Sequence, residues 1–244
     1  MNDKMNENKL DHRRKYYLVL DCGVKPSKRF VQSVSGLCIT HCHTDHSRYA
    51  HMYRGVPIIG TKEELNNKRI LSQYDMISNV PKFVYIDNYL ELEEFKITAL
   101  KASHDTDNPV HFIITIGKFM FFYGCDSVDY PPEYDEYFDK CDLIMVDCNY
   151  DEVLMQTDRN IYEPYSPELK ERIIKKGHAS NQYIKERFGK YEKKLILGHL
   201  SQGYNLTSKT SDIFDCAVTV ASNNSCPITI EVRYEQRRDS KQSS

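Results

Sequence analysis

Residues 37–46 of the chain are Leu37-Cys38-Ile39-Thr40-His41-Cys42-His43-Thr44-Asp45-His46, an apolar run followed at once by a cluster of histidines. The apolar part has the length and composition of a short buried strand. His41 and His43 are two residues apart, so an extended backbone points both imidazoles to the same side. Asp45 and His46 can turn toward a second position if the chain bends into a helix. Because side chains at the carboxyl ends of strands point into a shared crevice, the stretch predicts a binding site there.

This histidine cluster has the composition of a metal site. Four ligand-type side chains within six residues are more than one metal ion needs, and they suit two neighbouring metals. Imidazole nitrogen and carboxylate oxygen are good ligands for zinc. The alternative is a polar loop that is rich in histidine by chance.

Three more candidate ligands follow strand-like runs later in the chain. His104 comes after the run 95–100, Asp126 after 119–123 and His199 after 195–197. Taken singly, a histidine at a strand end is more often a hydrogen-bonded loop residue. Together with the first cluster, these residues make five histidines and two aspartates at strand ends, and they argue against a chance cluster. The set therefore predicts a dinuclear metal site.

The order of segments indicates one domain. Short strands and helices come first, with a helix expected over 61–71 that Thr61 and Glu64 would cap. Residues 83–123 then follow a strand pattern with a hairpin turn at 117–118, and strands and helices return after 143. Neither a repeat nor a linker interrupts the order, which favours two packed sheets with outer helices. We expect a polar N-terminal segment over 1–15, the domain over 16–236 and a disordered tail over 237–244.

Composition excludes several classes of protein. Among the 244 residues, 33 Lys and Arg balance 35 Asp and Glu for a net charge of −2, which excludes a strongly basic protein that coats nucleic acid. Apolar runs stay short of the roughly 18 residues that a membrane span needs. The first twenty residues lack the pattern of a secretory signal, so we expect a cytoplasmic protein without a membrane partner. The eight cysteines, which include no C-x-x-C pair, are expected to stay reduced and mostly buried.

Seven of these residues resemble the ligand pattern of the metallo-β-lactamase fold superfamily, over about residues 16–204. They are His41, His43, Asp45, His46, His104, Asp126 and His199. The resemblance implies an α/β fold, a four-layer αββα sandwich with a dinuclear site at the edge of its sheets. Asp21 matches the acidic residue that supports the metal loop in that fold. The glycine- and serine-rich hairpin that usually opens the family is replaced here by the short polar segment 1–15, so the first hairpin is expected to be degenerate.

Two late motifs narrow the resemblance. Residues 177–181, Gly-His-Ala-Ser-Asn, and 197–201, Leu-Gly-His-Leu-Ser, are similar to the paired motifs of the tRNase Z-like branch. Asp126 stands where antibiotic-hydrolysing members carry cysteine, and His43 stands where flavo-diiron members carry glutamate. Phage anti-Pycsar cyclic-nucleotide phosphodiesterases belong to the same branch, and they are compact, dimeric and without an RNA-gripping arm. The resemblance to them implies a homodimer.

Roles for the site residues follow from this set. We assign one metal to His41, His43 and His104, the other to Asp45, His46 and His199, and place Asp126 between them. Two Zn²⁺ ions per subunit are expected, with Mn²⁺ as the alternative. Paired cations lower the pKa of bound water and stabilise an in-line displacement at phosphorus, and Asp45 could orient that water. His178 is the second candidate catalytic residue, which would bind phosphate or protonate the leaving oxygen, the alternative being a histidine at a helix end.

For the remaining candidate residues, a structural role competes with a functional one. We take His51 as a surface or packing residue and His111 as a hydrogen-bonded residue of a strand. Tyr150 and Tyr204 follow candidate site segments and could stack on a base, but packing is the commoner role. Residues 168–194 carry an excess of basic residues beside His178, which could attract a small anion or could be a solvated helix face.

The leading functional hypothesis is a dinuclear-zinc phosphodiesterase that opens 3′,5′-cyclic nucleotides (cCMP, cUMP, also cAMP and cGMP) to 5′-monophosphates. Such a phage protein would act in the host cytoplasm and evade the host Pycsar defence. The alternative is a metal-dependent nuclease that acts on single-stranded DNA or RNA ends, so nucleic acid stays open as a partner. A non-catalytic, metal-stabilised protein is a third class, which the complete ligand set argues against.

Overall fold

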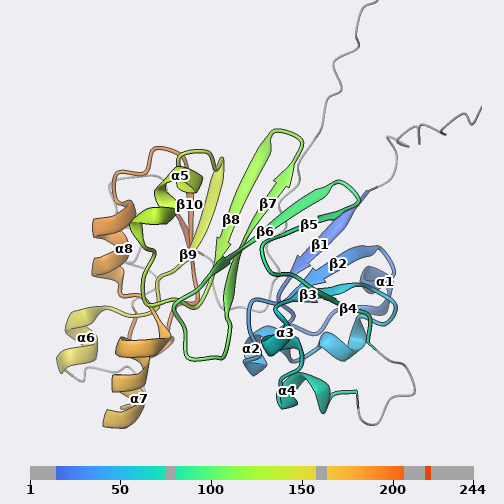
Figure 1. The fold of residues 1–244 in the computed structure, drawn as a ribbon. Coiled ribbons are helices and arrows are strands. Elements are labelled where there is room, and N and C mark those ends of the chain that lie inside the picture. Colours follow the sequence, from blue (N-terminus) through green and yellow to red (C-terminus); the bar gives the residue numbers. More distant parts are fainter. Residues whose placement is uncertain (1–14, 75–80, 158–163, 206–217, 221–244) are drawn as a thin grey trace, which may run out of the picture.

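The computed structural model describes residues 15–74, 81–157, 164–205 and 218–220, which form two β-sheets with short helices outside them (Figure 1). The first sheet is parallel throughout and contains four strands in the order β1-β2-β3-β4. These strands are β1 (Tyr17–Leu20), β2 (Val34–Cys38), β3 (Ile58–Gly60) and β4 (Phe83–Tyr85).

The second sheet contains seven strands in the order β11-β10-β9-β8-β7-β6-β5. Neighbours from β5 to β8 are antiparallel, and neighbours from β8 to β11 are parallel. As a result β6, β8, β9 and β10 all run in one direction, and their carboxyl ends meet at one edge. The strands are β5 (Tyr89–Leu92), β6 (Phe95–Lys101), β7 (Val110–Ile116), β8 (Phe119–Gly124), β9 (Leu143–Asp147), β10 (Lys194–Gly198) and β11 (Val218–Val220).

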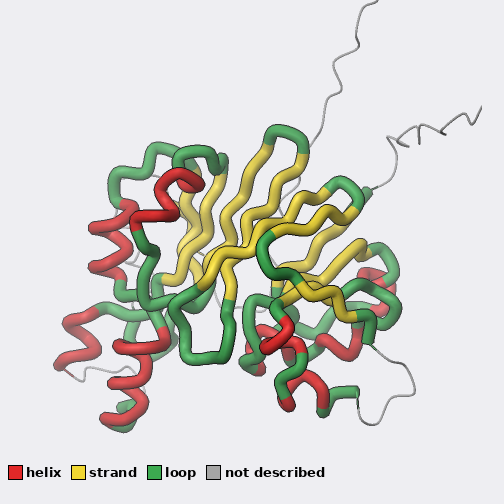
Figure 2. Tube along the Cα trace, in the orientation of Figure 1, coloured by secondary structure: helices red, strands yellow, loops and turns green. Residues whose placement is uncertain are grey.

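The helices are short and occur in two groups (Figure 2). Those of the first half are α1 (Lys28–Val31), α2 (Thr44–Ser47), the 3-10 helix η1 (Ala50–Met52), α3 (Lys62–Leu65) and α4 (Lys68–Leu71). Those of the second half are η2 (Pro132–Tyr134), α5 (Asp135–Phe138), α6 (Glu152–Thr157), α7 (Pro167–Arg172), the π-helix η3 (Ile173–Gly177) and α8 (Asn181–Phe188). Within the described ranges, no helix has the length and apolar character needed to cross a membrane.

The alternation of side chains along the strands builds four layers. In β2, Leu37 packs outward in a cluster that includes helix residues of α3 and α4, whereas Cys38 faces the second sheet. In β8, Phe122 packs outward against the α5 and α8 cluster, whereas Phe121 lies in the cluster between the sheets. Each sheet is thus buried on both faces, and the predicted αββα sandwich is confirmed.

One local prediction holds and two are wrong. Gly117, with a φ of 58°, turns the β7–β8 hairpin at the predicted place, where Ile116 pairs with Phe119. The expected helix over 61–71 is instead split into α3 and α4. The expected cap is also absent, because Thr61 donates its hydroxyl to the carbonyl of Asn108 and the Glu64 side chain bonds to other loops.

All six cysteines in the described ranges are buried and unpaired, as expected of reduced core residues. Some predictions fall outside the described residues. These are almost all of the segment 1–15 with any opening hairpin in it, most of the predicted domain after residue 205, and the tail 237–244.

Candidate metal centre

The candidate ligands converge because their strands end at one edge of the two sheets. The 41–46 stretch follows β2, and His104, Asp126 and His199 follow β6, β8 and β10. Asp21, Asp126 and His199 each come just after a strand and have φ values of 58°, 54° and 55°. A left-handed backbone is uncommon for residues other than glycine, and it turns these side chains abruptly out of the sheets. Backbone strain of this kind clusters at functional sites.

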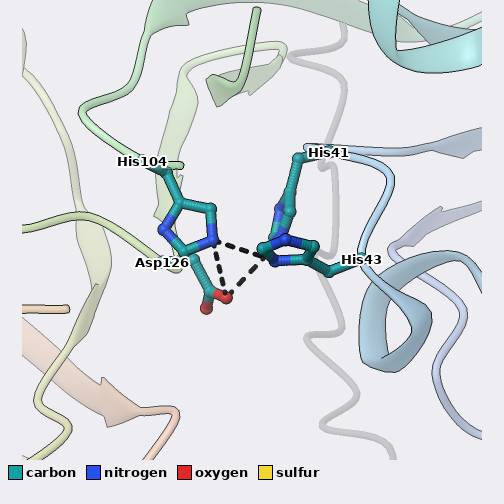
Figure 3. Close-up of side chains that lie close together, drawn as sticks. All are labelled: His41, His43, His104 and Asp126. Atoms are coloured by element: carbon teal, nitrogen blue, oxygen red, sulfur yellow. Dashed lines mark hydrogen bonds and ion pairs between the residues drawn. The ribbon is translucent and has the colours of Figure 1, made fainter. Parts of the chain in front are cut away.

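Four of the predicted ligands form a first group (Figure 3). One ligand atom from each of His41, His43, His104 and Asp126 lies within 4.8 Å of all the others. Asp126 Oδ2 is 3.5 Å from His41 Nε2 and 3.7 Å from His104 Nε2, and His104 Nε2 is 3.1 Å from His43 Nδ1.

The second group shares Asp126 with the first. Asp45, His46, Asp126 and His199 also place one ligand atom each within 4.8 Å of one another. His199 Nε2 lies 3.2 Å from Asp126 Oδ1 and 3.1 Å from Asp45 Oδ2, and His46 Nε2 lies 3.2 Å from Asp126 Oδ2. All seven residues singled out in the sequence are therefore brought together, divided as predicted, with Asp126 common to both groups.

The far ring nitrogens of three histidines are held by the protein, which turns the near nitrogens toward the centre. His46 Nδ1 donates to Asp21 at 2.7 Å, and His104 Nδ1 donates to the carbonyl of Gly177 at 2.7 Å. His41 Nδ1 lies 3.0 Å from the hydroxyl of Thr40. Hydrogen bonds of this kind fix the tautomer and leave Nε2 as a lone-pair donor for a metal.

His43 is oriented the other way round. Its Nε2 lies 3.6 Å from Asp105 Oδ1, and its Nδ1 faces His104. A carboxylate behind a ligand imidazole raises its basicity and sets its orientation. Asp105 was not singled out from the sequence, although it directly follows His104.

Two buried atoms at the centre show that the donor set fits cations. His41 Nε2 and Asp126 Oδ1 are buried and make no hydrogen bond within the described part of the chain. Leaving such groups unmatched is unfavourable in a protein interior, and a cation between them would satisfy both. Nitrogen and carboxylate oxygen in two groups of four suit two Zn²⁺ or Mn²⁺ ions, with His41, His43 and His104 on one side, Asp45, His46 and His199 on the other, and Asp126 shared.

Without bound metal, the charges of the side chains differ between the two groups of candidate ligands. Burial and the neighbouring His46 lower the pKa of His41, so this ring is neutral. Burial also opposes the charge of His199, but Asp126 and Asp45 outweigh it and raise the pKa of His199 to about 9. Asp126 is ionised, because despite its burial His199 and His46 hold its pKa well below the usual range.

Asp21 anchors the metal loop, in keeping with the role implied by the family resemblance. Its Oδ1 accepts a hydrogen bond of 2.8 Å from the backbone N–H of Thr40, and its Oδ2 accepts from His46 and from the hydroxyl of Tyr123. This single buried carboxylate therefore ties the loop to both sheets.

A second histidine–aspartate pair stands beside the centre. His178 Nδ1 donates to Asp147 Oδ2 at 2.7 Å, and the His178 ring stacks on His199 with 4.7 Å between centroids. Burial disfavours a charge on His178, but Asp147 outweighs it and raises the pKa of His178. Asp147 was not predicted from the sequence, although it directly follows the apolar run 143–146, much as Asp126 comes shortly after the run 119–123.

Neither group of candidate ligands includes His51 or His111. His51 contacts the side chain of Gln73 at 3.1 Å, as a packing residue would. Tyr150 and Tyr204 are buried in one apolar cluster, which agrees with a packing role. The interpretation of His111 as hydrogen-bonded is wrong. Its ring is fully buried among Phe122 and Tyr130, and neither nitrogen has a hydrogen-bond partner in the described ranges.

A cavity of about 460 Å³ opens over the candidate centre. The candidate ligands form one side of this cavity, and helices α4, α7 and η3 form the rest of its walls. Its lining comprises His43, Thr44, Asp45, Arg69, Asp126, Tyr165, Leu169, Arg172, Ile173, Gly177 and His178.

Solved structures share this fold. The metallo-β-lactamase fold protein YhfI from Bacillus subtilis is 17% identical with a TM-score of 0.58, over 84% of this chain and 85% of that chain. Zn²⁺-bound PqqB from Methylobacterium extorquens is 13% identical with a TM-score of 0.57, over 86% and 81%. A diphosphatase from the PhnP family is 13% identical with a TM-score of 0.53, over 77% and 68%.

Curated proteins give no match to this sequence. The family model of the beta-lactamase superfamily domain does match it, over residues 18–189. This range contains six of the seven candidate ligands and ends before His199. Since the match covers well over half of the sequence, the chain belongs to the beta-lactamase superfamily domain family.

Proposed function

We propose that the protein is a metal-dependent phosphodiesterase that hydrolyses 3′,5′-cyclic nucleotides to 5′-monophosphates. The observation that carries the proposal is the His178–Asp147 pair, held at 2.7 Å, beside a donor set for two cations. A dinuclear centre activates water, and a histidine poised next to it can protonate a leaving alkoxide. Hydrolysis of a phosphate diester requires both.

Asp45 and His178 each have a defined role in the proposed reaction. Bound cations would polarise the attacking water and stabilise the negative charge on the phosphoryl oxygens. Asp45, whose carboxylate faces the cavity and lies 3.1 Å from His199, orients that water. The water oxygen bonds to phosphorus, the bond from phosphorus to O3′ breaks, and His178 donates its Nε2 proton to O3′. A proton from the water then restores His178.

The pair of His178 and Asp147 suits a general acid. Since Asp147 accepts the Nδ1 proton, Nε2 is the nitrogen left for the substrate. Against the opposing effect of burial, the carboxylate favours the doubly protonated ring and raises the pKa of His178, which favours the acid form that protonates a leaving oxygen. Asp147 itself is fully buried and has no access to the substrate.

The size of the cavity favours a small substrate. About 460 Å³ lies within the range of sites for single small molecules, roughly 300–1,000 Å³, and is enough for one nucleotide. Tyr165 and Leu169 supply an apolar wall for a base. The 177–181 and 197–201 motifs are similar to those of the tRNase Z-like branch, to which anti-Pycsar phosphodiesterases belong, and this supports the same class. The PhnP-family diphosphatase with this fold also acts on a phosphate compound.

A nuclease that acts on single-stranded DNA or RNA ends is the second candidate. Helix η3, which supplies Ile173 and Gly177 to the cavity, also carries two exposed basic residues, Lys175 and Lys176. A strand of nucleic acid needs such a positive track for the phosphates that flank the reacting one.

The test is to incubate metal-loaded protein with cyclic CMP, UMP, AMP and GMP, and separately with single-stranded oligonucleotides, and to resolve the products. We expect 5′-monophosphates from the cyclic nucleotides. Turnover of oligonucleotides alone would favour the nuclease, and no turnover of either at full metal occupancy would exclude both.

The proposal also covers the metal content, the oligomeric state and the biological source of the enzyme. It includes two Zn²⁺ ions per subunit with Mn²⁺ as the alternative, a homodimer, and a phage protein that removes the Pycsar signal in the host cytoplasm. Metal analysis and mass measurement of the purified protein in solution test the first two of these.

A further inference from the structure

Two arginines line the cavity from opposite walls. Arg69 belongs to α4, which lies with the first sheet, and Arg172 belongs to α7, which lies with the second (Figure 1). Both line the same 460 Å³ cavity as Asp45, Asp126 and His178. A ligand that occupies the cavity over the candidate metals is therefore flanked by two guanidinium groups.

Arg69 is held in place by its helix. The side chain of Asn67 accepts a hydrogen bond of 3.0 Å from the backbone N–H of Arg69 and so caps α4. Gln73 Nε2 donates both to the carbonyl of Arg69 at 3.2 Å and to the carbonyl of Ser47 at 3.0 Å. Because Ser47 ends α2, the helix that contains Asp45 and His46, α4 is tied directly to the metal loop.

Within the described residues Arg69 forms no ion pair, and its side chain is exposed. In a cavity that also contains ligand carboxylates, an unpaired guanidinium adds positive potential where a small anion would enter.

Arg172 is fixed differently. Its Nε contacts Asp105 Oδ2, while Asp105 Oδ1 lies 3.2 Å from His104 Nε2. Among the described residues the terminal Nη groups make no hydrogen bond, so the outer edge of the guanidinium is available to a ligand. Asp105 thus connects the first group of candidate metal ligands to the opposite wall of the cavity.

We propose that Arg69 and Arg172 form a phosphate clamp, in which both guanidinium groups bind oxygens of the phosphoryl group, so that the site selects phosphate esters over acyl substrates. The inference deepens the proposed phosphodiesterase function and rests on it. A phosphodiester has two non-bridging oxygens, and its negative charge grows from one to two when the attacking water adds to phosphorus and gives up a proton. An arginine guanidinium can donate two parallel hydrogen bonds to such oxygens. A carbonyl has a single oxygen, which would bind a metal ion and leave no acceptor for a second guanidinium.

The test measures binding rather than turnover. Metal-loaded protein, with its metal content determined for each variant, is titrated with inorganic phosphate in a calorimeter. Arg69→Gln is expected to weaken phosphate binding about tenfold, as loss of one charge-assisted contact would, and Arg172→Gln to do the same. Arg69→Lys should fall between, since lysine keeps the charge but not the fork. The matched control is Lys68→Gln, which removes an exposed neighbouring charge on α4 that does not line the cavity.

The outcomes separate this inference from the proposed function. Equal phosphate affinity in the wild type, Arg69→Gln and Arg172→Gln at full metal occupancy would overturn the clamp, even if cyclic nucleotides are hydrolysed. An equal loss in Lys68→Gln would overturn it too, because general surface charge would then explain the effect. Weaker binding in both arginine variants, with no hydrolysis of any cyclic nucleotide, would support the clamp and reject the proposed reaction.

Discussion

The buried carboxylate of Glu64 accepts a hydrogen bond of 2.7 Å from the backbone N–H of Cys42, between the first two candidate metal ligands. Its other oxygen accepts a hydrogen bond of 2.9 Å from the backbone N–H of Asn108. One side chain therefore joins the loop of His41 and His43 to the loop of His104. The geometry of the first ligand group depends on a residue that binds no metal itself.

Replacing Glu64 with glutamine should destabilise the fold and loosen the site. The amide keeps one acceptor oxygen, but its NH₂ group would face a backbone N–H, which leaves a buried donor unmatched. We expect the free energy of unfolding to fall by about 2 kcal/mol, measured by urea denaturation, and metal affinity to fall with it.

The matched control for this change is Glu63→Gln. Glu63 is exposed, and its carboxylate accepts a hydrogen bond of 3.0 Å from the side chain of Asn108, so its effect should stay within about 0.5 kcal/mol. Equal stability of the two variants would show that the buried Glu64 contacts do not support the metal loop.

His178→Gln and Asp147→Asn should both impair catalysis through the leaving group. With the general acid lost or misoriented, we expect kcat for cyclic nucleotides to fall by about 100-fold or more at unchanged metal content. Bis(p-nitrophenyl) phosphate has a leaving group that needs no protonation, so its hydrolysis should change little. Steady-state kinetics with both substrates make the comparison.

Equal losses on the two substrates would contradict the assignment of His178 as the acid. They would indicate instead that His178 binds phosphate or only supports His199, on which its ring stacks.

His111→Leu should stabilise the protein. Burial lowers the pKa of His111 to about 3, and neither ring nitrogen has a partner in the described ranges. Leucine removes two unmatched polar atoms, which should raise the free energy of unfolding by about 1 kcal/mol at pH 7.

The same substitution should remove a pH dependence. A depressed folded pKa means that the unfolded state takes up the proton first, so stability is fully present above pH 6.5 and is lost as the pH falls. The difference between His111→Leu and the wild type should therefore widen by about 2 kcal/mol between pH 7 and pH 5. Denaturation at the two pH values measures it, and a constant difference would show that His111 is not buried as a neutral ring.

Metal binding should release protons from the second ligand group. Without metal, His199 has a pKa of about 9 and is protonated at pH 7.5, whereas the pKa of His41 is lowered and its ring is neutral. A cation must displace the His199 proton, so metal affinity should rise with pH until about 9. Titration calorimetry in two buffers of different ionisation enthalpy counts the protons, and none released at pH 7.5 would contradict the charges assigned to the two groups.

The ligand positions could be predicted because they depend on local pattern. His104, Asp126 and His199 each follow an apolar run, and strands that run in one direction deliver the residues after them to one edge. The αββα layering followed from the order of segments together with the family resemblance.

Apart from Asp21, which the family resemblance indicated, the supporting contacts could not be predicted, because the residues that make them are distant in sequence. Arg172 contacts Asp105 across 67 positions and His178 contacts Asp147 across 31. Glu64 was expected to cap its own helix, but tertiary contacts with Cys42 and Asn108 took precedence over the local motif.

We propose that seven side chains hold two metal ions, with Asp126 shared between them. The test is the metal content of the purified chain after loading with Zn²⁺ and removal of excess metal. We expect two equivalents per wild-type chain, and loss of metal from both groups in Asp126→Ala. One equivalent or none in the correctly folded wild-type chain, or two equivalents retained in Asp126→Ala, would contradict it.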